Sequence, residues 1–471
     1  MDIIDTIYID GAFVTPHGTE LFDLHNPATG RVIGAVRLGD AVDALAAIAA
    51  AKRAFPAFSR TTKEERIALL GRLAEAVEAR AADLVEATIE EYGAPVSRSA
   101  WMADYAAGAF RLAAQTLESY AFTRRIGSAS VTMEPLGVVG VITPWNANAG
   151  FICGKLAMVV ASGSTCVIKP SEMSALQTRI VLEALHEAGV PAGVFNVVNG
   201  RGDVVGAALS ASPDVARISF TGSTATGRAI LRAAAESFKR VTLELGGKSP
   251  MVVLDDADFA AAIPFALAAG FNNSGQACIA GTRILVPRSR LAPFEAAIGE
   301  AVTRIKSGDP RDPETVIGPM VSRRQWDRVQ SYIRRGVAEG ATLLAGGEGL
   351  PEGMQGGWFV RPTIFTNVGN DMVIAREEIF GPVLSIIPYA DDAEAIAIAN
   401  DTEYGLHAYV AGTDEARARA VADRLVAGRV IINAAPMEPL APFGGFRHSG
   451  IGRENGVFGL EAYLEPKAVM G

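Results

Sequence analysis

Apolar and polar residues recur along the first 120 positions with the spacing of amphipathic helices. This spacing predicts helices over residues 40–55, 63–92 and 99–120. In the second of these helices the apolar side chains that share one face are Leu69, Leu70, Leu73 and Val77. Thr62 stands where a helix cap is expected, and Glu65 follows three residues later, so this helix should begin at residue 63.

Beyond residue 137 the pattern changes to short β-branched runs, which predict strands at 138–142, 165–170, 195–198, 217–222 and 241–244. Helices are expected between them at 174–188 and 225–236. Strands that alternate with helices imply a parallel sheet covered on both faces, so the fold class is α/β. A second series follows Gly247, with strands expected at 251–254, 283–286, 383–387 and 429–433. It predicts a second α/β domain, and the glycine-rich residues 441–456 predict a fixed loop.

Composition narrows the class of protein. A chain of 471 residues is too long for one hydrophobic core, so two or three domains are expected. Apolar residues make up 49% and charged residues 20%, as in soluble globular proteins. The net charge of −9, with no block of Lys or Arg, argues against nucleic acid as a partner. No signal peptide and no run of eighteen apolar residues is visible, so we expect no membrane partner and a cytoplasmic location.

The three cysteines, Cys153, Cys166 and Cys278, cannot build a disulfide framework, and their spacing predicts no metal site. A reducing compartment is therefore expected. We interpret Cys153 and Cys166 as buried packing residues, one in a helix and one in a strand.

Two polar and glycine-rich stretches interrupt the apolar runs. Cys278 ends the stretch Phe271-Asn272-Asn273-Ser274-Gly275-Gln276-Ala277-Cys278, and Glu244 begins a glycine turn at Glu244-Leu245-Gly246-Gly247-Lys248. A thiol and a carboxylate can divide an oxidation into two steps, capture of a carbonyl carbon and hydrolysis of the resulting thioester. The plainer alternatives are an inert buried cysteine and a glutamate in a surface ion pair.

Further motifs follow one another in a fixed order. They are Pro144-Trp145-Asn146, Lys169-Pro170-Ser171-Glu172, Phe220-Thr221-Gly222-Ser223-Thr224-Ala225-Thr226-Gly227, the Glu244 and Cys278 stretches, Glu377-Glu378-Ile379-Phe380-Gly381-Pro382-Val383 and Pro442-Phe443-Gly444-Gly445. Together they closely resemble the NAD(P)-dependent aldehyde dehydrogenase superfamily, in its hydrolytic class that does not acylate coenzyme A. The resemblance extends over about residues 8–467.

The resemblance implies a Rossmann-like cofactor domain, a second α/β catalytic domain and a small β arm that bridges subunits. The NAD-binding domain is expected at 1–117 and 135–246, and the catalytic domain at 247–450. The oligomerisation arm is expected at 118–134 and 451–471. Such arms imply a homodimer or a homotetramer.

The resemblance also implies the catalytic roles. Cys278 is expected to be the nucleophile, and Glu244 the general base that activates water. The amide of Asn146 is expected to stabilise the oxyanion, beside the backbone N–H of Cys278; the alternative for Asn146 is a turn residue. Lys155 matches a lysine near the site of the family, where a structural role is equally open.

NAD is the cofactor expected from the resemblance, with NADP possible. The loop from Gly222 to Gly227 lies between a strand and a helix, where backbone N–H groups can hold a pyrophosphate. Lys169 and Glu172 resemble the pair that holds the adenosine ribose, and a carboxylate there would repel a 2′-phosphate. The full set of expected cofactor contacts is Thr143, Trp145, Lys169, Glu172, Gly202, Gly222, Ser223, Gly227, Leu245, Glu378 and Phe380.

The substrate is expected to be a small-molecule aldehyde in a roomy and mostly uncharged tunnel. The expected lining residues are Ala147, Gly150, Phe151, Gly154, Asn272, Met437 and Phe443. Because several are small and none is an arginine, medium or long aliphatic, cyclic-derived or aromatic aldehydes are favoured over semialdehydes of diacids and betaine aldehyde.

Three alternatives remain open at this point. A coenzyme A-acylating semialdehyde dehydrogenase shares the thiol, but such relatives lack the glutamate. A non-enzymatic relative would be expected to lose the cysteine or the glutamate. A phosphorylating sugar-phosphate dehydrogenase has an unrelated order of motifs.

Overall fold

The structure is a computed structural model that describes residues 2–471. Its first large sheet has eight strands, and five of them, from β12 to β10, run parallel. Antiparallel strands close both edges. In order across the sheet the strands are β20 (Gly450–Ile451), β12 (Arg240–Glu244), β11 (Arg217–Thr221), β8 (Val138–Ile142), β9 (Thr165–Lys169), β10 (Phe195–Val197), β2 (Ile7–Ile9) and β3 (Ala12–Val14).

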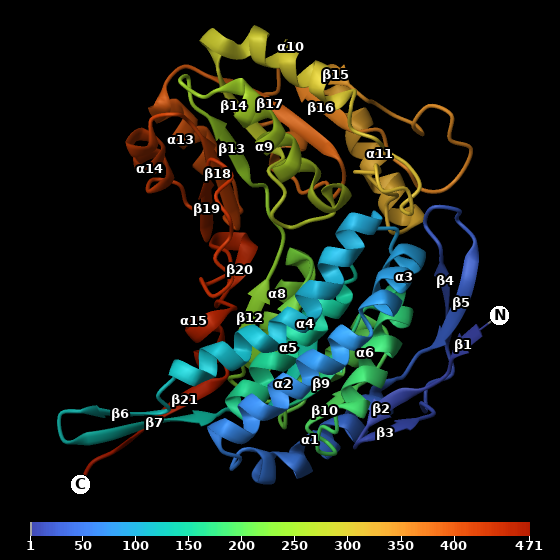
Figure 1. Cartoon of the computed structure of the whole chain (residues 1–471), viewed down its shortest axis with the longest axis vertical. Coiled ribbons are helices and arrows are strands. Elements are labelled where there is room, and N and C mark those ends of the chain that lie inside the picture. The colour runs from blue at the N-terminus through green and yellow to red at the C-terminus, as the bar shows by residue number, and fades with distance from the viewer. Residues whose placement is uncertain (1) are drawn as a thin grey trace.

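Both faces of this sheet are apolar. The central strands have apolar residues at successive positions, and successive side chains of a strand point to opposite faces. In β8, Val139 and Val141 join the core under one helix layer, whereas Val138 and Ile142 join the core under the other. The helices of the first layer are α2 (Lys63–Ala79), α3 (Ala81–Glu91), α4 (Val96–Ser119), α5 (Asn148–Ser162) and α6 (Ala175–Glu187), which lie together in Figure 1. The second layer contains α1 (Ala41–Phe58), α7 (Ala207–Ala211) and α8 (Thr224–Ala235).

The second large sheet has seven strands, all parallel except β15. Its order is β15 (Thr342–Ala345), β16 (Thr363–Thr366), β17 (Val383–Tyr389), β14 (Arg283–Pro287), β13 (Pro250–Val253), β18 (His407–Ala411) and β19 (Arg429–Ile432). The helices around it are α9 (Phe259–Phe271), α10 (Leu291–Val302), α11 (Arg323–Ala338), α12 (Val373–Arg376), α13 (Asp392–Asn400) and α14 (Glu415–Ala422). This unit occupies the upper part of Figure 1.

Two three-stranded sheets complete the fold. One contains β1 (Asp2–Ile4), β5 (Val32–Arg37) and β4 (Leu21–His25). The other contains β21 (Leu464–Val469), β7 (Ala129–Pro135) and β6 (Thr123–Ile126), and it is antiparallel throughout. In Figure 1 the β6–β7 hairpin extends away from the body of the molecule, near the C-terminus and the short helix α15 (Gly456–Glu461).

The predicted strands of both series are present, and the predicted cap of α2 is confirmed. Thr62 Oγ1 accepts the N–H of Glu65 at 3.1 Å, and Glu65 accepts the N–H of Thr62 at 2.7 Å. The prediction of one helix over 63–92 was wrong: the chain bends at Arg80, so two helices form. Residues 441–456 were also more than a loop, because β20 pairs with β12 at the edge of the first sheet.

Over residues 2–471, no helix has the length and apolar character needed to cross a membrane.

Candidate active site

The first sheet has a topological switch point beside β8. From β8 the chain continues through β9 and β10 on one side, then returns to form β11 and β12 on the other. In such sheets ligands bind outside the carboxyl ends of the strands at the switch point. The predicted residues stand at these ends: Thr143 follows β8, Lys169 ends β9, Gly222 follows β11 and Glu244 ends β12.

The segment before Cys278 has an unusual backbone. Asn273, Ser274 and Gly275 have φ values of 54°, 59° and 73°, so three successive residues lie in the left-handed region. A conformation of this kind costs free energy at the first two positions and persists only where contacts fix it. The Asn273 amide donates to the carbonyl of Asn146 at 2.9 Å, and Ser274 Oγ accepts the N–H of Gly318 at 2.9 Å. A side chain at Gly275 would overlap the backbone of Gly381.

Gln276 fixes the same segment from the other side. Its side-chain oxygen accepts the N–H of Val321 at 2.9 Å, and its side-chain amide donates to the carbonyl of Pro319 at 3.3 Å. The Asn146 amide donates to the carbonyl of Gln276 at 3.0 Å. Asn146, predicted to stabilise an oxyanion, therefore lies against the backbone two residues before Cys278, with one amide hydrogen left for another acceptor.

The glycine turn after Glu244 lies directly against the backbone of Cys278. A side chain at Gly247 would overlap the carbonyl oxygen of Cys278, and one at Gly246 would overlap the carboxylate of Glu378. Glu378 accepts the N–H of Gly247 at 3.0 Å. The turn can pass this closely between the cysteine and Glu378 only because it has no side chains.

Cys278 is half-buried, whereas Cys153 and Cys166 are fully buried, as expected for packing residues. Burial, followed by the nearby carboxylates of Glu378 and Glu244, raises the pKa of the Cys278 thiol to about 12, against smaller opposing effects of backbone N–H groups. In the protein without bound ligands the thiol is thus protonated at neutral pH.

Glu244 is buried, and across residues 2–471 neither of its carboxylate oxygens has a hydrogen-bond partner. Burial, followed by the charge of Glu454, raises the pKa of Glu244 well above its ordinary value, while Lys155 and two arginines act in the opposite direction. The surface ion pair considered as an alternative is not present. Lys155 instead donates to Ser219 Oγ at 3.0 Å and forms an ion pair with Glu454.

At the carboxyl end of β9, Lys169 donates to Glu172 at 3.2 Å and to the carbonyl of Gly200 at 2.9 Å. The guanidinium of Arg201 lies 3.7 Å from the other oxygen of Glu172 and also pairs with Glu20. Burial lowers the pKa of Lys169. The two predicted ribose contacts are therefore adjacent, with one more cation beside them.

The predicted pyrophosphate loop leads from β11 into α8. Ser223 is the cap of α8, and its hydroxyl accepts the N–H of Thr226 at 3.2 Å. Gly227 packs on Leu245, where a side chain would overlap the leucine methyl groups. Gly202 begins the short helical segment Gly202–Gly206. Backbone N–H groups at the start of α8 are the kind of donors that bind phosphates.

Trp145 and Phe380 form the remaining predicted wall of this crevice. Their rings meet edge to face, with centroids 5.4 Å apart. Phe380 has a φ of 61°, and its carbonyl accepts the amide of Gln325 at 2.7 Å. The buried hydroxyl of Thr143 has no partner within the described residues. Burial raises the pKa of Glu378 to about 7.

The predicted substrate residues do not all line one cavity. Gly150, Phe151 and Gly154 line a narrow cavity beside α4, together with Tyr105. Asn272 lines a separate groove against α9. Ala147 packs with Trp145 in a small apolar cluster.

The remaining two predicted substrate residues, Phe443 and Met437, belong to the C-terminal part of the chain. Phe443 lies 5.8 Å from the ring of His407, and Met437 is half exposed.

Several residues near the site were missed by sequence reasoning. Tyr105 packs against Gly150, and its pKa is raised by burial and by the charges of Glu454 and Cys278. Arg429 interacts with the charges of Tyr105 and Glu244. The helical spacing of Trp101 and Tyr105 could have indicated an aromatic stripe, but no local signal indicates Arg429 or Glu454.

No group of three or more His, Cys, Asp or Glu residues in the described part of the chain is arranged to hold a metal ion.

Fold and site together define a doubly wound α/β protein in which a cysteine lies beside the crevice of the first sheet. The chain belongs to the aldehyde dehydrogenase family, whose model matches residues 13–469. It is 46% identical to a 3-succinoylsemialdehyde-pyridine dehydrogenase of Pseudomonas sp over 466 residues, covering 98% of each chain.

Two solved structures have the same fold. A variant of aldehyde dehydrogenase C from Pseudomonas syringae, in complex with NAD+ and octanal, has a TM-score of 0.98 and 45% identity, covering 99% of this chain and 96% of that one. An aldehyde dehydrogenase of Mycobacterium tuberculosis in complex with NAD+ has a TM-score of 0.96 and 40% identity, covering 100% of this chain and 98% of that one. The expected aldehyde dehydrogenase fold is confirmed.

Proposed function

We propose that this protein oxidises an aldehyde to the carboxylic acid with NAD, using Cys278 as nucleophile and Glu244 as general base. The observation that carries the proposal is the buried carboxylate of Glu244. It has no hydrogen-bond partner in the described structure, and its charge acts on the thiol of Cys278. A buried carboxylate without a partner costs free energy, which is expected where catalysis requires a free base.

In the first step the sulfur of Cys278 bonds to the carbonyl carbon, and the carbonyl oxygen becomes an oxyanion. Because the thiol is protonated at neutral pH, its proton must leave as the bond forms, and Glu244 is the candidate acceptor. The free amide hydrogen of Asn146 and the N–H of Cys278 stabilise the oxyanion. A preorganised donor of this kind contributes roughly 2.7–4 kcal/mol to lowering a barrier.

Bound NAD would supply the acceptor for the hydride that leaves the former carbonyl carbon, which would leave a thioester on Cys278. Glu244 first releases to solvent the proton that it took from the thiol; it then takes a proton from water, and the water oxygen bonds to the acyl carbon. The carbon–sulfur bond breaks, which releases the acid and restores the thiol. The sum is aldehyde, NAD+ and water giving acid, NADH and a proton.

The residues at the switch point fit NAD. Lys169 and Glu172 supply a donor and an acceptor for ribose hydroxyls, the start of α8 supplies backbone N–H groups, and Glu378 and Phe380 stand on the far side. The Glu172 carboxylate would repel a 2′-phosphate, so NAD is favoured over NADP. In this proposal residues 1–117 and 135–246 bind NAD, and 247–450 carry the nucleophile.

Small residues support a medium or long aliphatic, cyclic-derived or aromatic aldehyde. Gly150 and Gly154 line a narrow cavity with Tyr105, and Ala147 is also small. The octanal in the Pseudomonas syringae complex and the pyridine ring in the name of the Pseudomonas relative agree with such a substrate.

NADH formation across an aldehyde panel tests the proposal. We expect Cys278→Ala to lose NADH formation while it still binds NAD, and Cys166→Ala, a matched change at a buried packing cysteine, to keep it. Glu244→Gln should accumulate acyl-enzyme, visible by mass spectrometry. Product analysis with and without coenzyme A separates hydrolysis from acyl transfer. Rapid turnover by Cys278→Ala, or an acyl-coenzyme A product, would overturn the proposal.

A further inference from the structure

Arg201 brings a second cation to the pair of Lys169 and Glu172 at the carboxyl end of β9. Its Nε and one terminal nitrogen donate to the same carboxylate oxygen of Glu20, at 3.0 and 2.6 Å. The other terminal nitrogen lies 3.7 Å from Glu172, which is too long for a hydrogen bond. Because a guanidinium has five N–H donors, Arg201 faces Glu172 with donors that no residue of the described chain uses.

The space beside Arg201 is open. A side chain at the next residue, Gly202, would meet no atom within 4 Å outside its own turn of the chain. The side chain of Arg201 is 37% exposed, whereas that of Lys169 is 5% exposed. The ring of Phe22, in β4, supports the guanidinium, with its centroid 5.0 Å from the guanidinium carbon. A ligand can therefore reach Arg201 while the guanidinium stays in place.

The charges around Lys169 and Glu172 oppose one another. Hydrogen bonding to Glu20 raises the pKa of Arg201, and the charges of Glu20, Glu172 and Asp203 add to this effect, against burial. Two cations thus stand among three carboxylates, of which Glu172 bonds to Lys169. A phosphate at this position would be repelled by Glu172 and attracted by Arg201. An arginine suits a phosphate well, because two parallel N–H groups can donate to two of its oxygens.

We infer that Arg201 determines cofactor specificity: it binds the 2′-phosphate of NADP and offsets the repulsion of that phosphate by Glu172. This inference rests on the proposed function, in which Lys169 and Glu172 contact the adenosine ribose, and deepens it by assigning NADP as a second cofactor. NAD has a 2′-hydroxyl in place of the phosphate, and that hydroxyl can donate to Glu172 without help from Arg201. The protein therefore uses both dinucleotides, and its preference for NAD is smaller than Glu172 alone would impose.

The test compares two ligands that differ only in the 2′-phosphate. We would measure the Kd of 2′,5′-ADP and of 5′-AMP for the full chain by isothermal titration calorimetry, and then those of NADP+ and NAD+. In Arg201→Met the Kd of 2′,5′-ADP should rise on the order of 10-fold, the lower end for a hydrogen bond to a charged group, because Arg201 is partly exposed. The Kd of 5′-AMP should stay near the wild-type value. The ratio of kcat/KM for NADP to that for NAD should fall by a similar factor, mainly through KM.

Variants of the neighbouring carboxylates separate direct binding from positioning. If Arg201 acted only by holding Glu172 in place, Arg201→Met would have no effect on a Glu172→Gln background. We expect it there to weaken 2′,5′-ADP by at least the same factor as in the wild type. Glu20→Gln should tighten 2′,5′-ADP, because it releases two donors of Arg201. Arg201→Lys should keep part of the affinity, since lysine retains the charge but not the planar fork.

Arg111→Met is the matched control, because Arg111, on α4, forms an exposed ion pair with Glu78. It should leave the Kd values of both nucleotides unchanged. Equal effects of Arg201→Met on 2′,5′-ADP and 5′-AMP, or no effect on either, would overturn the inference. The proposed function fails differently: no aldehyde then yields NADH, whatever the affinities of the two nucleotides.

Discussion

His407 shows how one buried side chain can set a pH dependence. It begins β18, is buried between Tyr409 and Phe443, and neither ring nitrogen has a partner in the described structure. Burial, aided by the charge of Arg429, lowers the pKa of His407 to about 3. The imidazole is therefore neutral in the folded protein throughout the pH range of ordinary assays.

We expect this residue to destabilise the protein in mild acid. Between pH 6.5 and about 3 the unfolded chain binds a proton at His407 and the folded chain does not. Stability should thus be fully present above pH 6.5 and fall by roughly 1.4 kcal/mol per pH unit below it. In His407→Phe this contribution disappears, so its urea midpoint should fall less between pH 7.5 and 5.0 than that of the wild type. Equal losses in both proteins would contradict the assignment.

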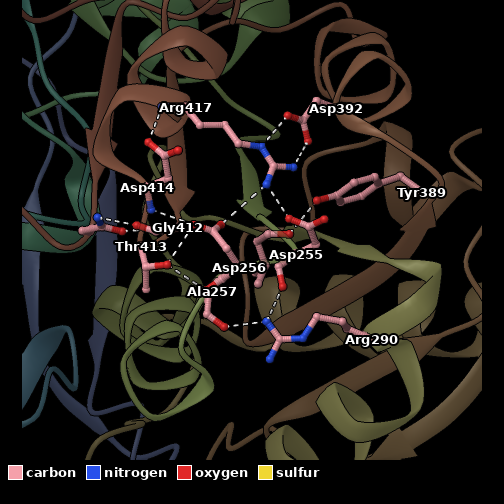
Figure 2. A network of polar contacts seen from close by, with 12 residues as sticks. Asp255, Asp256, Ala257, Arg290, Tyr389, Asp392, Gly412, Thr413, Asp414 and Arg417 are labelled. Atoms are coloured by element: carbon pink, nitrogen blue, oxygen red, sulfur yellow. Dashed lines mark hydrogen bonds and ion pairs between the residues drawn. The ribbon is translucent and has the colours of Figure 1, made fainter.

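At the scale of elements, the second sheet uses its carboxyl edge differently from the first. The chain switches sides between β13 and β18, and the loops after their carboxyl ends contain Asp255, Asp256 and Thr413. Figure 2 shows Arg417, from α14, reaching into this position, with Asp255, Asp256 and Asp392 around its guanidinium. A position that binds ligands in many α/β sheets is thus filled by an ion-pair network.

Replacing Arg417 by methionine should weaken this junction. Three carboxylates would then face one another without their common cation, and the pair with Asp392, at 2.6 and 2.7 Å, would be lost. We expect a lower thermal midpoint, by on the order of a few degrees. Added salt should narrow the difference, since it screens the repulsion. Arg111→Met, which removes one exposed pair, should change the midpoint less; a similar drop in both would argue against the network.

Elements with a strong local signal could be predicted from the sequence. The β-branched runs of β8, β9 and β11 and the cap of α2 are local patterns, and the structure has them where expected. The break at Arg80 could not be predicted, because the apolar stripe continues across it. Long-range pairing has no local signal either, as between β12 and β20.

The same limit applies to the site. Glu244 and Cys278 stand out in the sequence. Glu244 precedes a pair of glycines and Cys278 follows one glycine, both within apolar stretches. The meeting of Glu244 with the charge of Glu454 depends on the path of the last fifty residues. Gly150 and Asn272 were expected in one tunnel, whereas in the structure they line two different cavities.

At the scale of the whole molecule, the antiparallel sheet of β6, β7 and β21 lies apart from the two large sheets (Figure 1). All four residues of β6 are exposed. Apolar side chains are exposed around this sheet, with Ile126 67%, Val469 55% and Met470 73% accessible. An exposed sheet edge with apolar side chains is a template for association with another chain. We therefore propose that residues 118–134 and 451–471 form the contact of a homodimer or homotetramer.

Charges placed on this sheet should separate the subunits. We expect the double variant Ile126→Glu and Val469→Glu to elute with a mass near 49.3 kDa in size-exclusion chromatography with light scattering, whereas the wild type gives a multiple of that mass. The reason is that both new carboxylates would be buried in the contact without a partner, and burying such a charge costs free energy that the contact would have to supply. Val337→Glu, an equally exposed position on α11, serves as the control and should keep the wild-type mass. A monomeric wild type, or a double variant that keeps its mass, would show that this sheet is not the contact.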